Sequence, residues 1–232
     1  MAFANQKIQR LLHADLSKKG SVDEPIVDLV EFINSLPHYF TTSSCSGRIL
    51  IFENDLQADK KGCKWLYVSH TYVTLEEILT HLTAVPDEAV FKFEPFIMHV
   101  QCQTLEDAQK LHQAAVAAGF RNSGITIGGK GKIMMAVRST HSLEAPLSSE
   151  GKLIVSQEYI KFLTECANKK MEENKNRIHR FFELVKTLST KTESNKTLKT
   201  KCPVKKVKKV THSEDGTKET ETDLSLFVFD VS

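Results

Sequence analysis

The chain begins with two segments in which apolar residues recur every three or four positions. Such spacing places the apolar side chains on one face of a helix. We expect the first helix to end at Gly20, because glycine adopts the left-handed conformation that closes a helix. In the second, Asp23 is placed to cap the N-terminus, Pro25 lies in the first turn and Pro37 ends the helix. The apolar stripes are Ile8, Leu11, Leu12 and Leu16 in the first helix, and Ile26, Leu29, Val30, Ile33 and Leu36 in the second.

The middle of the chain alternates between short strand-like runs and helices. Thr74-Leu-Glu-Glu77 and Thr104-Leu-Glu-Asp107 each follow a predicted strand and open a helix, the first with the pattern of a capping box. This recurrence predicts a duplicated β–α–β unit. The helix after Thr104 is expected to end at Gly119. Strands are predicted at 48–52, 64–68, 90–93, 96–100, 125–129 and 133–137, the first two as an antiparallel pair.

The last third of the chain predicts one long helix and a tail. Ser156 is placed to cap a helix over 157–187, and the polar run 172–176 within it is expected to face solvent. After Ser189, serine, threonine and lysine dominate, and five residues at 205–209 include four lysines. We therefore expect one folded domain over 1–188 and a disordered, lysine-rich tail over 189–232.

Composition narrows the class of protein. Of 232 residues, 41% are hydrophobic and 26% charged, which is typical of a globular protein, and the net charge of +2 does not by itself indicate nucleic acid. No apolar run has the length of a membrane span, and the first residues lack an apolar signal region. The five cysteines are widely spaced, so we expect neither a disulfide framework nor a standard zinc module. A cytoplasmic location is favoured, with the nucleus as the alternative.

The densest group of reactive side chains is Thr41-Thr-Ser-Ser-Cys-Ser-Gly-Arg48. We interpret it as a loop in which Gly47 turns the chain, small residues bring a ligand close to the backbone, and Arg48 binds a carboxylate or phosphate. The alternative is a serine-rich loop that bonds only its own backbone. Cys45 as a nucleophile would need a base that spacing cannot show, so an unreactive cysteine is favoured.

A second candidate segment runs from Phe120 to Lys132 and contains the spacing of a phosphate-binding loop. Position 131 is glycine rather than serine or threonine, and a strand follows where a helix should begin, so an NTPase is excluded. A hairpin turn carrying Lys130 remains, which would contact an anionic ligand or an RNA backbone, or simply face solvent. His99 and Cys102 point to opposite faces of a strand, so they do not predict a metal site.

Several blocks of the chain, in order, resemble the tRNA wybutosine-synthesizing protein 3 family from about residue 10 to residue 180. They are Asp15-Leu-Ser-Lys-Lys-Gly-Ser-Val-Asp23, Phe40-Thr-Thr-Ser-Ser-Cys-Ser-Gly-Arg48, Trp65-Leu-Tyr-Val-Ser-His70, Lys92-Phe-Glu-Pro-Phe-Ile-Met-His-Val-Gln-Cys102, Gly119-Phe-Arg-Asn-Ser-Gly-Ile125 and Ala136-Val-Arg-Ser-Thr-His141. The tail after Ser189 carries no such resemblance.

The resemblance implies a methyltransferase that uses S-adenosylmethionine and no metal. Its target would be N4 of the tricyclic wybutosine precursor next to the anticodon of phenylalanine tRNA, and contact with other enzymes of that pathway would be a further expectation. It also implies an α+β fold whose mixed, largely antiparallel sheet is built from duplicated β–α–β units with flanking helices. A Rossmann-type fold is not expected, since no strand is followed by G-x-G-x-x-G.

Candidate site residues combine the resemblance with the two segments above. Glu94, His70 and His99 are the candidate catalytic bases, with Glu94 favoured because its apolar neighbours would raise its pKa if it were buried; the alternatives are that it points to solvent or pairs with Arg121 or Arg138. The rival functions are an RNA-binding module without turnover and a small-ligand sensor. Candidate cofactor-binding residues are Ser44, Cys45, Ser46, Gly47 and Arg48, and candidate substrate-binding residues are Arg121, Asn122, Ser123, Gly124, Lys130 and Arg138.

Overall fold

The computed structural model describes residues 2–12, 21–53 and 64–194, and only the backbone of Lys130 and of residues 189–194. Its strands are β1 (Tyr39–Cys45), β2 (Arg48–Glu53), β3 (Lys64–Ser69), β4 (Ala89–Glu94), β5 (Ile97–Cys102), β6 (Gly124–Ile127), β7 (Ile133–Val137), β8 (Leu143–Pro146), β9 (Ser148–Ser149) and β10 (Lys152–Leu153). Its helices are α1 (Phe3–Leu12), α2 (Val27–Ser35), α3 (Leu75–Thr80), α4 (Leu105–Ala118) and α5 (Gln157–Ser194), with short 3-10 turns at Glu24–Ile26 and Gly129–Gly131.

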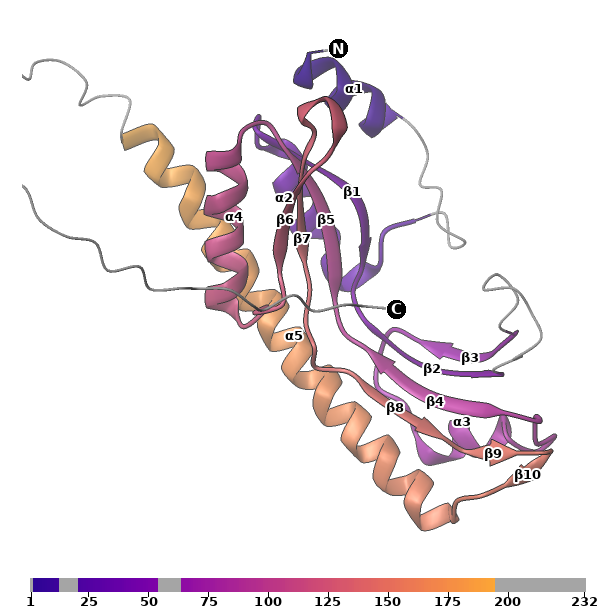
Figure 1. The fold of residues 1–232 in the computed structure, drawn as a ribbon. Coiled ribbons are helices and arrows are strands. Elements are labelled where there is room, and N and C mark those ends of the chain that lie inside the picture. Colours follow the sequence, from indigo (N-terminus) through magenta and orange to yellow (C-terminus); the bar gives the residue numbers. More distant parts are fainter. Residues whose placement is uncertain (1, 13–20, 54–63, 195–232) are drawn as a thin grey trace, which may run out of the picture.

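The strands form two four-stranded antiparallel sheets and one small hairpin of β9 with β10 (Figure 1). One sheet has the order β1-β5-β7-β6 and the other β3-β2-β4-β8. The chain passes directly from one sheet to the other at three short breaks. It leaves the first sheet between β1 and β2 and between β7 and β8, and it enters the first sheet between β4 and β5. These three breaks, which we call the crossovers, bring residues 45–48, 94–97 and 137–143 to the junction of the two sheets.

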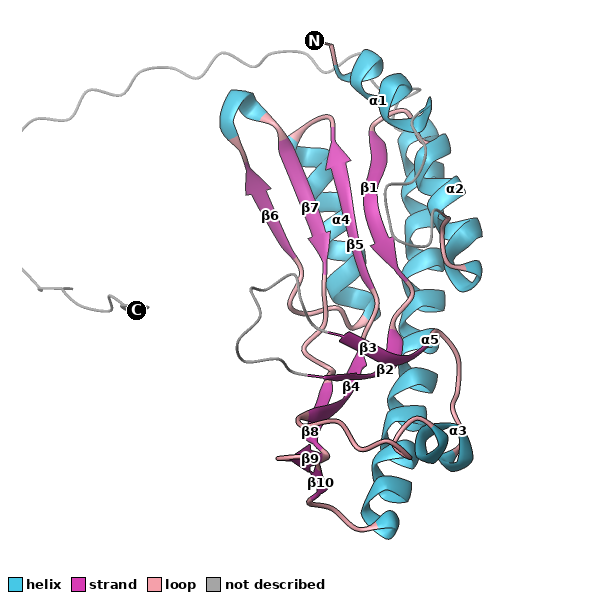
Figure 2. Cartoon of the chain, turned by 90° about the vertical axis from the view of Figure 1, so that its right-hand side faces the viewer, coloured by secondary structure: helices cyan, strands magenta, loops and turns pink. Residues whose placement is uncertain are grey.

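Each sheet buries one face against helices and has its own hydrophobic core. The core of the first sheet includes residues of α2, α4 and the second half of α5, such as Phe181 and Val185. The core of the second sheet includes α3 and the first half of α5, such as Leu163 and Met171. The long helix α5 therefore packs against one face of both sheets, as Figure 2 shows, and does not cover their other faces.

The expected α+β architecture with duplicated units is confirmed. In the second sheet, β3 and β4 flank β2 and are joined through α3; in the first, β5 and β6 flank β7 and are joined through α4. Thr74 makes the predicted capping box with Glu77, and Thr104 accepts a hydrogen bond from the backbone N–H of Asp107. Gly119 ends α4 with a φ of 105°, in the left-handed region that glycine accepts readily.

Three interpretations of local patterns are wrong. Residues 41–45 are not a loop but most of β1, because their backbone pairs with β5 along its length. Asp23 does not cap the second helix, since its carboxylate instead accepts the backbone N–H of Ser46 at 2.8 Å. The polar run in α5 does not simply face solvent, because Asn174 is only 1% exposed and lies between two crossovers.

Other predictions fall at the edges of what the structure describes. Ser156 does cap α5, whose Tyr159 N–H lies 3.3 Å from the serine hydroxyl, and the helix continues past residue 187 to Ser194. Leu16, Gly20 and the tail from residue 195 lie outside the described residues. Within the described ranges, no helix combines the length and the apolar character needed to cross a bilayer.

Candidate functional site

A pocket of about 410 Å³ lies where the three crossovers meet. Residues from both sheets contribute to its wall, which explains why chain segments far apart in sequence share it. Because two sheets must diverge where their common strands bend, the junction leaves a depression that side chains only partly fill. The lining residues are Cys45, Arg48, Glu94, Pro95, Phe96, Ile97, Asn122, Arg138 and Ser139.

Arg48 and Glu94 form an ion pair at the edge of this pocket. They are register partners on β2 and β4, and Arg48 Nε donates to Glu94 Oε2 at 2.7 Å. The other carboxylate oxygen lies 3.6 Å from Lys92 Nζ, and the guanidinium lies 4.4 Å from the centroid of the Trp65 ring. Glu94 is about one third exposed rather than buried. Its partner is thus Arg48, not Arg121 or Arg138.

One face of α5 holds all three crossovers in place. Asn174 donates from Nδ2 to the carbonyl of Ser46 and accepts the N–H of Phe96 at Oδ1, both at 2.8 Å. One turn further along, Arg177 Nη1 donates to the hydroxyl of Ser139 at 3.2 Å. A Cβ added to Gly47, which has a φ of 97°, would lie 2.9 Å from Asn174 Nδ2. Glycine is therefore required at this crossover by both its conformation and its contact with the helix.

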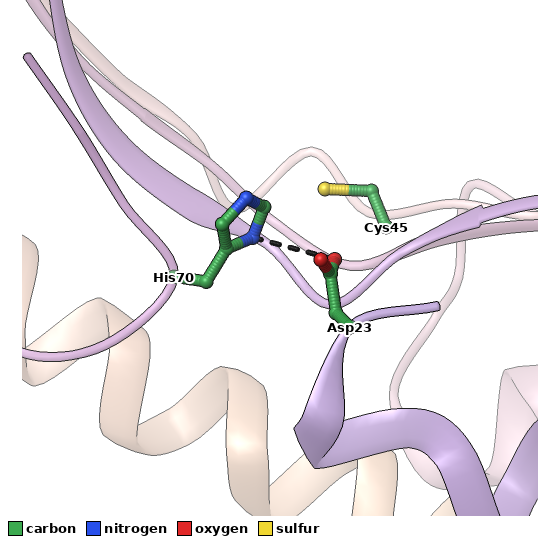
Figure 3. A group of neighbouring side chains, drawn as sticks. All are labelled: Asp23, Cys45 and His70. Atoms are coloured by element: carbon green, nitrogen blue, oxygen red, sulfur yellow. Dashed lines mark ion pairs between the residues drawn. The ribbon is translucent and has the colours of Figure 1, made fainter. Parts of the chain in front are cut away.

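Behind the first crossover, Asp23, Cys45 and His70 converge from three separate segments (Figure 3). Asp23 is 6% exposed, and its Oδ2 lies 3.3 Å from His70 Nδ1. The same ring nitrogen lies 3.0 Å from the carbonyl oxygen of Gly47. Burial raises the pKa of the Cys45 thiol; the N–H of Gly47 partly offsets this effect, while the Asp23 carboxylate adds to it. The thiol is therefore protonated at neutral pH and is not an activated nucleophile.

At the rim of the same pocket, Arg138 directly follows β7 and is exposed. Its backbone N–H donates to Ser123 Oγ at 3.1 Å, which ties the rim to the segment that carries Asn122. No acidic side chain among the described residues pairs with its guanidinium. Arg138 also lies close enough to His99 to lower the pKa of that imidazole, although burial is the larger cause. The rim therefore holds a cation that is available to an anionic ligand.

The structure brings some of the predicted site residues together and separates others. Cys45, Arg48, Glu94, Asn122 and Arg138 line the pocket. Their functional roles remain predictions.

The remaining candidates lie around the pocket or away from it. Ser46 is buried and Gly47 packs against α5, so their backbone supports the wall rather than lining it. Lys130 lies in the turn that precedes β7, at the other end of that strand from Arg138. The others are Ser44 on β1 opposite Met98, His70 beside Asp23, His99 on β5 beside Ser43, Arg121 exposed in the loop before β6, Ser123 bonded to Arg138, and Gly124 at the start of β6.

Sequence reasoning missed Asp23 and Asn174 as parts of the site. Asp23 lies two residues before Pro25 and is of a residue type that commonly caps helices, so the local pattern pointed to a different role. Asn174 is surrounded by Glu172, Glu173 and Lys175, and nothing in that run marks the asparagine as buried. Its one signal is its position three and four residues from the apolar Met171 and Ile178, which places it on the buried face of the helix.

Comparison with known proteins gives the class of enzyme to which this site belongs. The family profile described as "Methyltransferase TYW3" matches residues 4–187, which include every element that builds the pocket. The chain belongs to this family of methyltransferases.

The relatives agree with this assignment. The human protein named tRNA wybutosine-synthesizing protein 3 homolog is 54% identical over 183 residues, covering 78% of this chain and 71% of its own. An Arabidopsis thaliana protein named tRNA wybutosine-synthesizing protein 2/3/4 is 43% identical over 185 residues, covering 72% of this chain and 19% of its own. The chain is thus a methyltransferase of wybutosine biosynthesis, and the expected resemblance is confirmed.

Solved structures share the fold. The structure of protein PH1069 from Pyrococcus horikoshii superposes with a TM-score of 0.68 at 36% identity, covering 78% of this chain and 91% of that one. A hypothetical protein from Aeropyrum pernix gives a TM-score of 0.63 at 26% identity. The two rival functions, an RNA-binding module without turnover and a small-ligand sensor, are both wrong, since the family is one of enzymes.

Proposed function

We propose that the pocket at the crossovers binds S-adenosylmethionine beside the tricyclic base of the wybutosine precursor and methylates N4 of that base in phenylalanine tRNA. The observation that carries this proposal is the position of Arg138, a cation with no acidic partner among the described residues, in the same pocket as the Arg48–Glu94 pair. A family of wybutosine methyltransferases supplies the reaction class.

The cofactor's carboxylate would bind Arg138. A guanidinium binds a carboxylate through two parallel hydrogen bonds, and this one has no competing acid among the described side chains. Arg48, the residue expected from sequence to hold the carboxylate, already donates Nε to Glu94. Its interaction with a ligand would therefore be limited to the remaining guanidinium N–H groups. Asn122, exposed beside Arg138, would add an uncharged donor and acceptor to the same end of the pocket.

The base to be methylated would approach Glu94. In the reaction, the bond between sulfur and the methyl carbon breaks as the bond between N4 and that carbon forms, with S-adenosylhomocysteine leaving as a neutral thioether. The methylated nitrogen is cationic until its proton leaves. Of the three candidate bases, Glu94 lines the pocket, whereas His70 and His99 do not. A charged carboxylate suffices, because a proton on a cationic ring nitrogen is far more acidic than one on the neutral ring.

The test uses two measurements on purified full-length protein. Calorimetry with S-adenosylmethionine should give binding that falls by about one to two decades in Arg138→Gln, as expected for a lost charge-assisted contact of about 1.5–3 kcal/mol. The matched control is Arg121→Gln, a neighbouring exposed arginine outside the pocket lining. If both variants bind the cofactor like the wild type, Arg138 does not hold the carboxylate.

The second measurement follows methyl transfer to tRNA that carries the unmethylated precursor. Glu94→Gln retains the shape of the side chain and still accepts from Arg48, but it can no longer take up a proton. Single-turnover rates should fall by about two decades or more, while cofactor affinity and melting temperature stay close to those of the wild type. An unchanged rate would exclude Glu94 as the base, and a collapsed melting temperature would assign the residue to the fold instead.

A further inference from the structure

We propose that Asp23, Cys45 and His70 form a binding site for a zinc ion behind the wall of the pocket, independently of the methyl transfer. The three residues bring one carboxylate, one thiol and one imidazole together (Figure 3). Their donor atoms all lie within 4.8 Å of one another. Ligands of a tetrahedral zinc ion are separated by about 3.4–3.8 Å, so side-chain rotations alone would close the site.

The backbone around the three residues is fixed, which is what a preformed metal site needs. Cys45 is the last residue of β1 and pairs with Ile97, and His70 directly follows Ser69, the last paired residue of β3. Asp23 is held by the N–H of Ser46, which donates to its carboxylate at 2.8 Å. The ligands therefore come from three elements whose relative positions the two sheets already determine.

His70 faces the Asp23 carboxylate through Nδ1, which lies 3.3 Å from Asp23 Oδ2. A carbonyl oxygen, that of Gly47, lies 3.0 Å from Nδ1, and the hydroxyl of Ser46 lies 3.5 Å from the same atom. Because Asp23 lies on the Nδ1 side of the ring, Nδ1 is the nitrogen that would bind an ion together with Asp23, in place of its contacts with Gly47 and Ser46. The other ring nitrogen, Nε2, would then carry the proton of the neutral imidazole.

The set of donor atoms selects the kind of ion. Sulfur and imidazole nitrogen are poor ligands for magnesium and calcium, which prefer oxygen, whereas zinc binds sulfur, nitrogen and carboxylate oxygen together. The charges of Asp23 and of a Cys45 thiolate would balance the two charges of Zn²⁺. Three protein ligands leave a fourth position, and since Cys45 also lines the pocket, an ion here would stand directly behind the pocket wall.

The site can be tested without measuring methyl transfer. Chelator-treated full-length protein is titrated with Co²⁺, which occupies zinc sites and gives a thiolate charge-transfer band when a cysteine binds it. We expect one Co²⁺ per chain, the thiolate band, and loss of both on addition of Zn²⁺. Cys45→Ser, which keeps the size of the side chain, should abolish the band.

The matched control is Cys166→Ser on α5, another partly exposed cysteine that lies outside the cluster and should keep the band. His70→Gln should weaken Zn²⁺ binding at least tenfold. If that variant fails to fold, Cys45→Ser decides the question alone. The proposal is overturned if the wild type gives no thiolate band at stoichiometric Co²⁺, or if the band survives in Cys45→Ser. In that case the three side chains are held by their hydrogen bonds alone.

Discussion

At the scale of the single residue, the pKa of His99 reports whether the charge of Arg138 has been neutralised by a ligand. Burial and the nearby guanidinium both lower the pKa of the His99 imidazole below its ordinary value of 6.5. We expect Arg138→Gln to raise the pKa of His99 but not to restore it fully, since burial is the larger cause. Proton NMR titration of the imidazole would measure both values.

The sign of the effect on stability follows from the same shift. Because the folded state favours the neutral imidazole, the contribution of His99 to stability is present above pH 6.5 and is lost as the pH falls through the lowered pKa. Addition of S-adenosylmethionine to the wild type should change the His99 titration if the carboxylate of the cofactor neutralises Arg138. A titration that is the same in wild type and Arg138→Gln would show that the two side chains do not interact.

Single residues also show where sequence reasoning stops. Arg48 and Glu94 were both identified as site residues from their types and neighbours, yet their mutual ion pair depends on the register of β2 against β4. No local pattern specifies that register. The sequence could therefore identify five of the pocket-lining residues, but not that two of them neutralise each other and that Arg138 has no acidic partner in the described part of the chain.

At the scale of the element, the contacts of α5 with the crossovers can be tested through Asn174. In Asn174→Asp, one oxygen can still accept the N–H of Phe96, but the other faces the carbonyl of Ser46 and repels it. A charge is also buried, since this position is 1% exposed. We expect the free energy of unfolding to fall by about 3 kcal/mol or more. Urea denaturation monitored by circular dichroism gives this value.

The matched control is Asn176→Asp, which makes the same change at an exposed position two residues along the same helix. It should alter stability by less than about 0.5 kcal/mol. Equal losses in the two variants would mean that the aspartate affects the helix in general rather than the crossovers.

The buried thiol of Cys102, at the end of β5, should cause a loss of stability at alkaline pH. Cys102 is 2% exposed, and burial, with a smaller effect from Asp107, raises the pKa of its thiol from 9.0 to about 12. A raised pKa means that the contribution of Cys102 is complete below pH 9 and is lost between about pH 9 and pH 12. Near pH 10.5 this loss is about 2 kcal/mol.

Cys102→Ala removes this contribution. Urea unfolding of both proteins near pH 8 and pH 10.5 should show a smaller alkaline loss in the variant than in the wild type. An identical loss in both would mean that the thiol does not ionise on unfolding in this range. Burial also raises the pKa of Tyr39, and Asp107 and the Cys102 thiolate raise it further, so the difference between the two proteins includes the effect of this thiolate on Tyr39.

The boundaries of helices and strands were predicted better than the pairing between strands. Glycine, proline and capping residues marked most boundaries, because their conformational preferences act within a few residues. β1 was missed because its serines and threonines have the composition of a loop, and only pairing with β5 makes them a strand. The short strand β8 was missed for the same reason: it exists as the partner of β4.

At the scale of the whole molecule, the lysine-rich segment after α5 can be separated from the catalytic domain. The domain boundary expected at residue 188 is a prediction, and since α5 extends to Ser194, a truncation should follow that residue. The four lysines at 205–209 would contribute electrostatic affinity for tRNA. Removing residues 195–232 should raise the KM for tRNA and flatten its salt dependence, with turnover at saturating tRNA unchanged.

Steady-state kinetics of both proteins at several salt concentrations would measure this. The cofactor affinity serves as the internal control, because it should be the same with and without the tail. A truncated protein that binds S-adenosylmethionine normally but has lost turnover at saturating tRNA would contradict the prediction and assign the tail to the reaction itself.

The three shared strands and the long helix α5 have a consequence for cooperativity. Neither hydrophobic core can come apart by itself, because each would have to release the same helix and break the same strands that continue into the other sheet. The molecule should therefore unfold in a single transition despite its two cores. A ligand bound at the crossovers would contact both sheets, so its binding free energy would stabilise both halves of the molecule against unfolding at once.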